Sequence, residues 1–552
     1  MGRAPASARW QLRPVPPALA ARYRAEGLWR DQTLGQLADS GLRAGAGREL
    51  RVWSQTHPWR STLGAERERA LRLAAGLRGL GIGPGDAVAF QVPNLAEAAV
   101  TFYAIALLGA VLVPIVHFYG RKELRFILEQ SGAKAFVSVA RFRQTDYLAG
   151  LAGLRGALPE LETLVVVGGE APAGCVSFEA LLESDPLPGP LPVDPDAPAV
   201  VAYTSGTTAD PKGVIHSHRT LLAEVAQLSA TRPDDGRALL VGAPVAHGIG
   251  MLSGLLLPIT KGRPIHLIDV WDPKRVLEIM LEGDLSAGSG ATYFLTSLLD
   301  HPDFGPRHLE RMPKIGLGGA PVPAAVAERA EGLGISIIRS YGSTEHPSTT
   351  GAGHDEPAEK RKYTDGHALP GVELRLVDES GKQVPPGVPG EILSRGPDRF
   401  VGYTDPALSD AALDAQGWYR SGDVGVLDAD GWLTITDRVK DIIIRGGENV
   451  SAAEVEEILM RLPGVAEVAV VAAPDARLGE HGCAFFRMQP GAPAPGLDSV
   501  RSQLAGAGLA KQKWPEEIRS AAEFPRTPSG KIKKFALRDA LRRETGAPGA
   551  VG

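Results

Sequence analysis

The sequence has few of the residues that build metal or disulfide frameworks, and it has no excess of positive charge. Its 552 residues include two cysteines, Cys175 and Cys483, which are far apart in the chain. Two isolated thiols argue against a disulfide scaffold or a cysteine-based zinc site, and they fit a reducing cytoplasm. The net charge of −5 gives no electrostatic support for nucleic acid as a partner.

The sequence also lacks an uninterrupted hydrophobic run long enough to span a membrane. Residues 98–116, AAVTFYAIALLGAVLVPIV, approach that length, but Gly109 and Pro114 divide them and β-branched residues gather in their second half. This pattern predicts a buried helix followed by a buried strand. Residues 1–23 carry charges without the apolar core of a signal peptide. We therefore expect a cytoplasmic protein without a membrane span.

Helix-like segments alternate with short apolar runs along most of the chain. Residues 34–267 contain AVAFQVP, AKAFVSV and TLVVVGG, and a second set follows with PIHLID, KIGLGG and ISIIRS. This alternation predicts an α/β fold with two layered subdomains and largely parallel sheets. Residues 363–426 are rich in strand and turn signals and predict a small β subdomain. The length exceeds one ordinary core, and we place a domain boundary between Thr436 and Asp441.

The residues around and after this boundary predict a compact α+β unit. Asp430 and Gly431 mark a turn between two strands, and Ser451 with Glu454 forms the pattern of a capping box. Residues 466–471 predict a strand. One apolar helix face is expected from Val455, Ile458, Leu459 and Leu462.

Residues 201–218, VAYTSGTTADPKGVIHSH, form a stretch of small hydrogen-bond donors with one lysine. Glycine lets backbone N–H groups approach a ligand, and hydroxyls with an ammonium group suit a polyanion such as a triphosphate. The alternative is a polar surface loop between a buried strand, residues 199–203, and a helix that begins near His218. Composition alone leaves both interpretations open.

Five separated motifs resemble those of the adenylate-forming superfamily, which includes acyl-CoA ligases, luciferases and the adenylation domains of peptide synthetases. They follow the family's order and cover nearly the whole chain: YTSGTTADPKG (203–213), SYGSTE (340–345), YRSGD (419–423), DRVKDIIIRGGENVSAAEVE (437–456) and PRTPSGKIKK (525–534). The chain most resembles bacterial acyl-CoA ligases for alicyclic, aromatic, terpenoid or medium-chain acids, of the cyclohexanecarboxylate type. The resemblance implies ATP, Mg²⁺ and coenzyme A as cofactors, and a small carboxylic acid as substrate.

The resemblance also implies roles for individual residues in the first half-reaction. Thr344 would meet the α-phosphate, Glu345 would hold Mg²⁺, and Lys531 would reach the α-phosphate and the carboxylate. Asp423 would bind the ribose hydroxyls, and Arg438 would reach the ribose or a phosphate. The β- and γ-phosphates would be held by Thr204, Ser205, Gly206, Thr207, Thr208 and Lys212. The adenine would lie between Tyr341 and a segment made of Gly319, Ala320 and Pro321.

For the second half-reaction the family rotates a small, mobile C-terminal domain. The resemblance implies an N-terminal domain of residues 1–437, a hinge at 438–440 that includes Lys440, and a C-terminal domain of residues 441–552. Gly446 and Gly447 would leave room for the pantetheine arm of coenzyme A.

The acyl group is expected beside APVAHGIGM, residues 243–251. There the resemblance assigns His247, Gly248 and Gly318 to the substrate, and Gly250 adds to the expectation of a roomy pocket. A purely structural role for His247 remains open at this point.

Ala209 departs from the family, which usually has glycine at this position of the phosphate loop. A Cβ there carries a cost if the backbone needs a positive φ. Ala209 therefore leaves open an enzyme that only transfers a preformed acyl-adenylate to coenzyme A. Two further alternatives to a complete ligase also stay open: an enzyme that loads a carrier protein, and a non-catalytic acyl- or nucleotide-binding protein. A carrier protein is the less favoured acceptor, because no carrier module follows Lys531.

Overall fold

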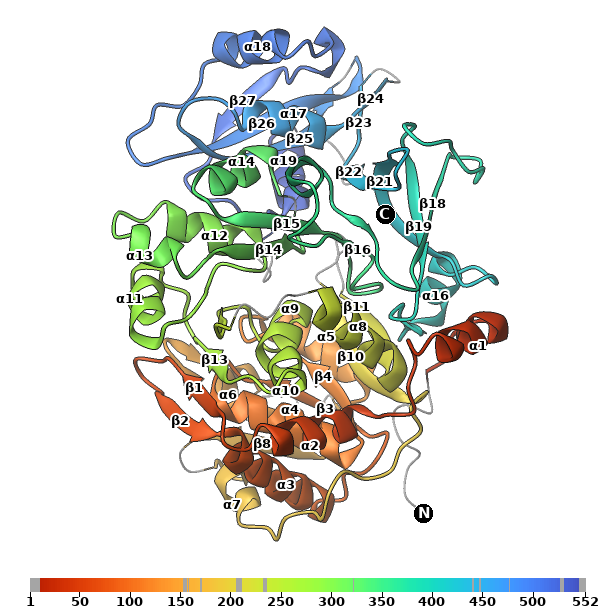
Figure 1. Ribbon diagram of the computed structural model, residues 1–552, viewed down its shortest axis with the longest axis vertical. Helices are drawn as coiled ribbons and strands as arrows, with labels where there is room; N and C mark the ends of the chain where they lie inside the picture. Colours follow the sequence, from red (N-terminus) through yellow and green to blue (C-terminus); the bar gives the residue numbers. More distant parts are fainter. Residues whose placement is uncertain are drawn as a thin grey trace.

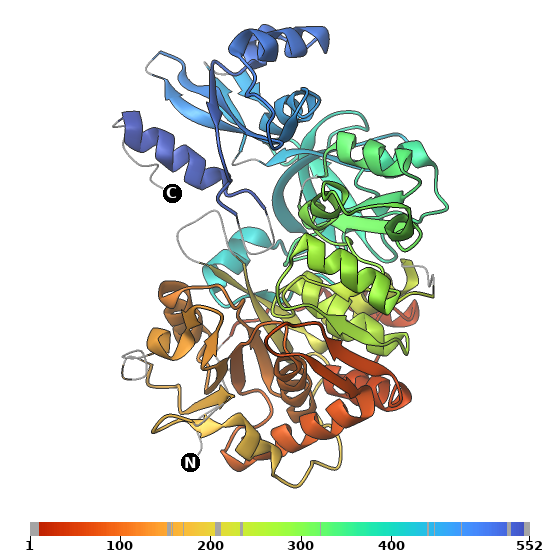
Figure 2. The ribbon, with the colours of Figure 1, turned by 90° about the vertical axis from the view of Figure 1, so that its left-hand side faces the viewer.

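The computed structural model describes residues 10–151, 156, 158–168, 171–204, 211–231, 236–320, 322–438, 441–445, 448–475, 477–526 and 531–545. Figure 1 shows the N-terminal α/β layers at one end, the β subdomain beside them, and the C-terminal elements at the other end. Figure 2 shows the same stacking from the side, with the C-terminal elements in blue. The predicted α/β class is confirmed.

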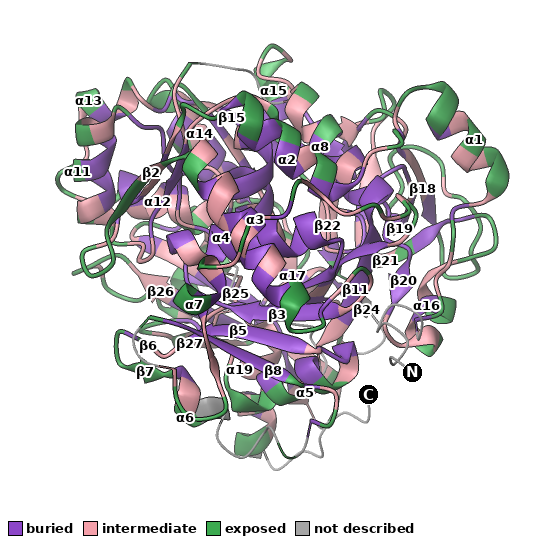
Figure 3. Ribbon diagram, turned by 90° about the horizontal axis from the view of Figure 1, so that it is seen from below, coloured by how far each residue is buried: buried purple, intermediate pink, exposed green. Residues whose placement is uncertain are grey.

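An eight-stranded sheet forms the centre of the N-terminal layers. Its strand order is β20-β11-β10-β4-β3-β5-β8-β9. The bounds are β3 Ala87–Gln91, β4 Val111–Pro114, β5 Ala135–Val139, β8 Thr163–Val167, β9 Val176–Ser177, β10 Pro198–Thr204, β11 Lys212–Ser217 and β20 Gly402–Tyr403. The parallel strands β3, β4, β5 and β8 are buried along their whole length, which explains their continuous apolar runs (Figure 3).

Helices cover this sheet and connect its strands. They are α1 Pro17–Ala25, α2 Leu34–Ala44, α3 Leu63–Gly79, α4 Ala96–Leu108, α5 Arg121–Ser131, α6 Tyr147–Leu151, α7 Phe178–Leu182 and α8 His218–Thr231. A short hairpin, β6 Arg141–Phe142 and β7 Thr145–Asp146, precedes α6. The interpretation of residues 98–116 is confirmed: α4 ends at Gly109, which has a φ of 70°, and β4 follows. The part of the chain that the structure describes has no helix long and apolar enough to cross a membrane.

The second set of strands does not form one sheet. The strands β1 Glu49–Val52, β2 Trp59–Thr62, β12 Leu240–Val241 and β13 Ile265–Leu267 make a four-stranded sheet in the order β12-β13-β1-β2. The strands β14 Lys314–Gly318 and β15 Ser336–Ser340 form a separate parallel pair. The parallel pairing of β1 with β13 brings the start of the chain into this second layer, although residues 34–267 were expected to build the first.

Short helices surround this second layer. They are α9 Gly248–Met251, a π-helix Leu252–Leu256, α10 Leu257–Thr260, α11 Pro273–Gly283, α12 Thr292–Leu299, α13 Pro306–Leu309, α14 Ala324–Gly332 and α15 Ala358–Tyr363. A two-stranded pair, β16 Thr350–Gly351 and β17 His367–Ala368, leads into the β subdomain.

The predicted β subdomain is an antiparallel sheet beside α16 Pro406–Ala412 (Figure 1). Its strands, in the order β18-β19-β21-β22, are β18 Glu373–Val377, β19 Gly390–Arg395, β21 Tyr419–Leu427 and β22 Leu433–Arg438. The predicted turn at Asp430 and Gly431 joins β21 to β22. Gly431 has a φ of 84°, a conformation that favours glycine.

The C-terminal residues form a separate α+β layer with its own apolar core. Its elements are β23 Ile443–Arg445, β24 Glu448–Val450, α17 Ala452–Leu459, β25 Val465–Asp475, β26 Gly479–Met488, α18 Leu497–Gly506, a 3₁₀ turn Lys511–Lys513, β27 Glu517–Ser520 and α19 Lys534–Thr545. The predicted apolar face of α17 packs into this core. The predicted capping box is half formed. Ser451 accepts a hydrogen bond from the N–H of Glu454, but the Glu454 carboxylate pairs with Lys513 at 2.6 Å.

Polar contacts join the C-terminal layer to α14 and β22. The Glu457 carboxylate of α17 accepts a hydrogen bond at 3.1 Å from the N–H of Ala324, the first residue of α14. Arg461 forms an ion pair with Glu328 at 3.1 Å, and the Ser451 hydroxyl donates to the carbonyl of Thr436. Together these contacts set the orientation of the C-terminal layer above α14 (Figure 1).

We expect Gly109→Ala to destabilise the protein by about 1–3 kcal/mol, because alanine resists a left-handed backbone and its Cβ would overlap the Val193 side chain. Gly79→Ala, at the last residue of α3, is the control. A Cβ at Gly79 meets no atom within 4 Å, so this variant should be neutral or more stable by about 0.5–1 kcal/mol. Thermal unfolding midpoints of the two variants provide the measurement. Equal shifts would contradict the assigned end of α4.

Candidate active site

A buried carboxylate, Asp423, contacts two other predicted site residues. It lies on β21 opposite Arg438 of β22 in the register of the hairpin. The Arg438 Nε donates to Asp423 Oδ1 at 2.7 Å, and the Tyr341 hydroxyl donates to Oδ2 at 2.7 Å. Asp423 is 4% exposed. The antiparallel pairing therefore sets the Asp423–Arg438 contact, and the end of β15 brings Tyr341 to it.

Lys531 reaches the same place from the C-terminal layer. Its pKa is lowered to about 8, first by removal of the ammonium group from solvent and then by the positive charge of Arg438, against the opposing carboxylates of Asp423 and Glu345. Burial and the charge of Lys531 together lower the pKa of His247 to about 4, so this imidazole is neutral at pH 7. Groups from five separate segments thus lie within one electrostatic site.

Glu345 lies deep in this site, with 8% of its surface exposed. Its Oε1 accepts a hydrogen bond at 2.8 Å from the hydroxyl of Tyr403, a residue of β20 that sequence reasoning did not find. Burial and the neighbouring Glu345 carboxylate raise the pKa of Tyr403, which keeps the hydroxyl protonated as a donor. The Lys212 ammonium lies 5.5 Å from the centre of the Tyr403 ring. Tyr403 pairs with Val214 in the register of β11 with β20. Because this pairing joins distant parts of the chain, no sequence motif pointed to Tyr403.

Two histidines hold the segment that carries Thr344 and Glu345. The Nε2 of His216 lies 2.7 Å from the carbonyl oxygen of Thr344, so this nitrogen carries the proton and donates. Burial lowers the pKa of His216 to about 4 and keeps it neutral. His346 lies between the Ser394 hydroxyl at 2.7 Å and the Asp398 carboxylate at 3.1 Å. These contacts fix the backbone on both sides of Glu345.

Gly342, in the middle of the SYGSTE motif, closes a tight turn in this segment. A Cβ at this position would overlap the carbonyl oxygen of Pro347, so a larger residue would push the turn open. The motif therefore needs glycine for close backbone packing.

The predicted acyl region lies where β14 ends beside α9. His247 is the N-cap of α9, and its Nδ1 accepts from the N–H of Ile249 at 3.4 Å. Gly319 has a φ of 74°. A Cβ added at Gly248 would meet open space, whereas a Cβ added at Gly250 would overlap the carbonyl oxygen of Pro244. Gly248 thus has free space beside it, whereas Gly250 serves close backbone packing; the roomy acyl pocket stays a prediction.

Gly318 and Ala320 also lie in this region, on either side of Gly319. A Cβ at Gly318 would meet the Ser340 hydroxyl at 2.5 Å, so this glycine lets β14 approach the end of β15. Ala320 is half-buried after the strand.

The phosphate loop begins and ends on neighbouring strands. Thr204, the last residue of β10, pairs with Lys212, the first residue of β11. Several predicted residues lie outside the described ranges, and their roles remain predictions: Ser205, Gly206, Thr207, Thr208, Ala209, Pro321, Lys440, Gly446 and Gly447.

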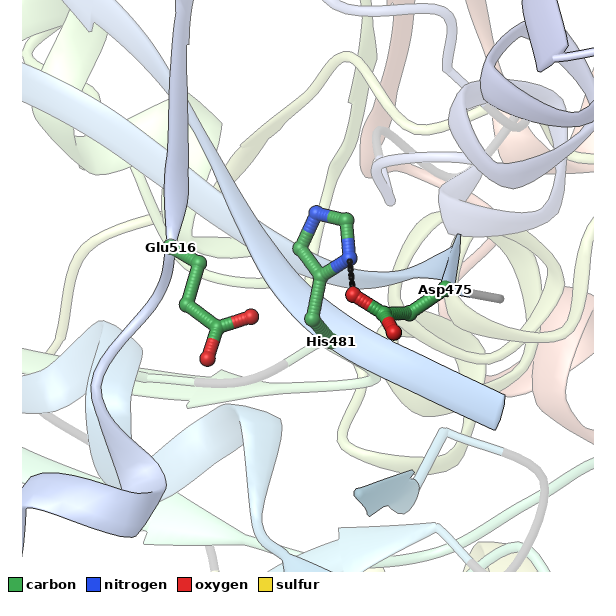
Figure 4. Close-up of side chains that lie close together, drawn as sticks. All are labelled: Asp475, His481 and Glu516. Atoms are coloured by element: carbon green, nitrogen blue, oxygen red, sulfur yellow. Dashed lines mark ion pairs between the residues drawn. The ribbon is translucent and has the colours of Figure 1, made fainter. Parts of the chain in front are cut away.

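A separate cluster of possible metal ligands lies on the C-terminal layer. It consists of Asp475, His481 and Glu516, whose ligand atoms lie within 4.8 Å of one another (Figure 4). His481 Nδ1 lies 3.5 Å from the Asp475 carboxylate. The Arg445 guanidinium donates to Glu516 at 3.1 Å, and its positive charge opposes the binding of a cation there. This cluster is distinct from Glu345, to which the sequence assigned Mg²⁺.

Family models match both parts of the chain. Residues 57–404 match the AMP-binding enzyme family, and residues 454–531 match the AMP-binding enzyme C-terminal domain. The predicted superfamily is confirmed by these matches.

Relatives with high identity include proteins named as coenzyme A ligases or synthases. The chain is 36% identical to a medium-chain fatty-acid–CoA ligase of Escherichia coli (strain K12), over 95% of this chain and 93% of that protein. It is 34% identical to a feruloyl-CoA synthase of an Amycolatopsis species, over 85% of this chain and 92% of that protein. The predicted enzyme class, an AMP-forming acid–thiol ligase, agrees with these names.

Solved structures share the fold over nearly the full length. The crystal structure of the anthranilate CoA ligase AuaEII in complex with anthranoyl-AMP superposes with a TM-score of 0.83 at 25% identity, covering 94% of this chain and 98% of that one. ATP-bound MatB from Rhodopseudomonas palustris gives a TM-score of 0.81 at 27% identity, covering 92% and 99%. The chain therefore belongs to the AMP-binding enzyme family, the adenylate-forming group that its five motifs predict.

Proposed function

We propose that this protein is an ATP-dependent acyl-CoA ligase for an alicyclic, aromatic, terpenoid or medium-chain acid. A carboxylate oxygen of the acid attacks the α-phosphorus of ATP, giving acyl-AMP and pyrophosphate. The thiol of coenzyme A then attacks the acyl carbon, giving acyl-CoA and AMP and releasing the thiol proton. The observation that carries this proposal is the meeting of Lys531 with Asp423, Glu345, Arg438 and His247 in one site.

The first half-reaction brings two anions together, so the site must supply positive charge. Arg438 supplies it from the end of β22, and Lys531 supplies it from the C-terminal part of the chain. Asp423 would bind the ribose, because each carboxylate oxygen accepts from one protein donor and has a further lone pair for a hydroxyl. Tyr341 would stack on the adenine against the segment of Gly319, Ala320 and Pro321.

Glu345 fits the metal predicted for this family. Its carboxylate is a hard oxygen donor, and Tyr403 orients it through one oxygen. Mg²⁺ held by Glu345 would supply positive charge beside the phosphates. Thr344 lies next to it on a backbone that His216 holds, where its hydroxyl would meet the α-phosphate. Lys212, with the loop from Thr204 to Thr208, would hold the outer phosphates.

The second half-reaction would follow a rotation of residues 441–552 about a hinge at 438–440. In the orientation described here Lys531 lies near Arg438, Asp423 and Glu345, which supports its proposed role in adenylation. Release of the Glu457–Ala324 and Arg461–Glu328 contacts would permit the rotation. Gly446 and Gly447 would then face the acyl-adenylate and leave room for pantetheine. Neutral His247 would line the path of the carboxylate.

The proposed function is tested by measuring pyrophosphate release and acyl-CoA formation in parallel over a panel of acids with ATP, Mg²⁺ and coenzyme A. Equal amounts of both products establish the complete ligase. If acyl-CoA forms from a synthetic acyl-adenylate but no acid gives pyrophosphate, the enzyme is the transfer-only alternative and not a complete ligase. Ala209 would then be the residue to examine first. Transfer to a phosphopantetheinylated carrier in preference to coenzyme A would contradict the proposed acceptor.

We expect Lys531→Ala to lower the rate of pyrophosphate release by about 10²-fold or more, because it removes a cation that stabilises developing negative charge. Conversion of synthetic acyl-adenylate to acyl-CoA should be retained within about threefold, since Lys531 leaves the site in the second step. Lys533→Ala, two residues away, is the control for local charge. Equal losses in both half-reactions would contradict the assigned role.

The pH dependence of adenylation should report the lowered pKa of Lys531. The ammonium form is the active one, so kcat/KM for ATP is expected to be highest below pH 8 and to fall as the pH rises through about 8. In Lys531→Arg this alkaline limb should move beyond the measurable range, because guanidinium stays protonated. A wild-type profile that stays flat to high pH would show that the charge of Lys531 does not limit the step.

Tyr403→Phe is expected to slow pyrophosphate release by about tenfold, because a hydrogen bond to a charged group contributes about 1.5–3 kcal/mol. Tyr363→Phe is a matched control. Its hydroxyl also donates to a carboxylate, that of Glu328 at 2.9 Å, but on the exposed surface. Mg²⁺ titrations of both variants provide the measurement. An unchanged rate and Mg²⁺ requirement in Tyr403→Phe would contradict its proposed hold on Glu345.

A further inference from the structure

The helix α14 begins without a cap from its own sequence. Its N-cap residue is Pro323, which has no side-chain acceptor, and its first turn contains no acidic residue. The first N–H groups of a helix have no partner within the helix, so they need an acceptor from elsewhere. Ala324 is buried, with 7% of its surface exposed, so its N–H has little access to water. This end of α14 therefore depends on an acceptor from another part of the chain.

The Glu457 carboxylate of α17 supplies this acceptor from the C-terminal layer. The Ala324 N–H donates to Oε1 at 3.1 Å and to Oε2 at 3.3 Å. A carboxylate at a helix N-terminus also interacts favourably with the partial positive charge of that end. The two residues are 133 positions apart in the sequence. The helix α14 thus receives its cap across the junction between the two parts of the chain.

A second contact extends the first along both helices. Arg461, four residues after Glu457, pairs at 3.1 Å with Glu328, which is four residues after Ala324. The Arg461 and Glu328 side chains are 46% and 34% exposed, so solvent screens this ion pair. A hydrogen bond from a buried N–H to a carboxylate is weakened less by solvent. We therefore expect the cap on Ala324 to be the stronger of the two contacts.

Glu457 moves with the C-terminal layer because its helix is packed into the core of that layer. Val455 and Leu459, two residues before and after Glu457, are fully buried in this core. The proposed rotation of residues 441–552 would therefore carry the Glu457 carboxylate away from Ala324. The cap forms only in the orientation described here.

The capped end of α14 lies next to the proposed nucleotide site. Only two residues, one of them Pro323, separate Ala324 from residues 319–321, the segment proposed to line the adenine. Proline restricts the backbone, so this short connection has little freedom to move. Lys531 approaches Asp423 from the same C-terminal layer that carries Glu457. The contact between the two helices thus forms in the orientation that brings Lys531 to the site.

We infer that Glu457 is a positioning residue for adenylation, because its cap on α14 holds the C-terminal layer in the orientation in which Lys531 reaches the site. The inference rests on the proposed ligase function, and Glu457 itself does not touch the substrate. A contact made in only one of two orientations shifts the balance between them toward that orientation. Adenylation gains from this shift, whereas acyl transfer, which uses the rotated orientation, does not.

The first test measures the two half-reactions separately in full-length Glu457→Ala enzyme, with the acid that the wild-type enzyme uses best. We expect pyrophosphate release at saturating ATP and acid to slow by about tenfold, the order of a lost hydrogen bond to a charged group. Conversion of synthetic acyl-adenylate to acyl-CoA should fall by no more than about twofold or should increase, because the rotated orientation becomes easier to reach. Parallel losses in both half-reactions, or no loss of pyrophosphate release, would overturn the inference.

Glu454→Ala is the matched control for damage to α17. The Glu454 side chain is 42% exposed, close to the 39% of Glu457, but it pairs with Lys513 within the C-terminal layer at 2.6 Å. Both variants remove a half-exposed carboxylate of one helix, and Glu457→Ala alone removes the cap on α14. Pyrophosphate release by Glu454→Ala should stay within about twofold of the wild-type rate. Equal losses in the two variants would assign the effect to α17 itself and overturn the role of the cap.

A double-mutant cycle tests whether Glu457 acts through Lys531. In Lys531→Ala enzyme the C-terminal layer no longer brings this cation to the site. Adding Glu457→Ala should then lower the remaining pyrophosphate release by no more than about twofold, because the two residues serve one step. A further loss of about tenfold would show independent effects and overturn the proposed action through Lys531.

Failure of this inference is distinguishable from failure of the proposed function. If wild-type enzyme forms neither pyrophosphate nor acyl-CoA from any acid of the panel, the ligase function is removed and the inference with it. If wild-type enzyme is active and Glu457→Ala changes both half-reactions equally, only the positioning role of Glu457 is removed.

Discussion

The Asp423 carboxylate, held between the Tyr341 hydroxyl and the Arg438 guanidinium, is the contact on which the rest of the site depends. It connects the end of β15, the strand β21 and the last described residue before the C-terminal layer. A buried carboxylate is costly unless it is paired and hydrogen-bonded, and here both of its oxygens have donors. Because Arg438 is tied to Asp423 by the hairpin register, the C-terminal layer starts from a defined point.

That starting point explains how Lys531 enters a site built by residues far earlier in the chain. The cation stays protonated near neutral pH because Asp423 and Glu345 oppose the effects of burial and of Arg438. Two contacts outside the site hold the C-terminal layer in place. The Glu457 carboxylate of α17 accepts from the N–H of Ala324 at the start of α14, and Arg461 pairs with Glu328. Exposed ion pairs of this kind contribute little each, about 0–1 kcal/mol. The Arg461–Glu328 pair therefore adds little to the free energy that would oppose the proposed rotation of the C-terminal layer.

Charge is distributed unevenly over a chain whose net charge is negative. Lys531 and Arg438 bring positive charge to the site, whereas Glu345 and Asp423 are the acids that would face the expected phosphates and ribose. Neutral histidines near these charged residues make hydrogen bonds that hold the backbone. His216 holds the carbonyl of Thr344, and its low pKa means that protonation does not disturb this contact near neutral pH. The proposed chemistry thus depends on the charges of lysine and arginine, while the histidines that hold the site by hydrogen bonds are neutral.

Local patterns in the sequence determined the elements whose signals are local. Gly109 ends α4 because a left-handed residue is needed within a few positions, and the turn at Asp430 and Gly431 joins β21 to β22 for the same reason. The parallel strands were predicted from continuous apolar runs, since burial on both faces removes polar positions. The motif residues Asp423, Arg438, Glu345 and Lys531 were found because each lies in a short, ordered pattern.

Only the tertiary structure decided which of these elements meet. The parallel pairing of β1 with β13, the hydrogen bond from Tyr403 to Glu345, and the hydrogen bond from Ala324 to Glu457 join residues from distant segments. Even the capping box of α17 was decided by a distant residue, because Lys513 takes the Glu454 carboxylate that the local pattern assigned to Ser451. Sequence neighbours record local backbone preference, whereas these contacts arise from packing after the chain has folded back on itself, and no single segment encodes them.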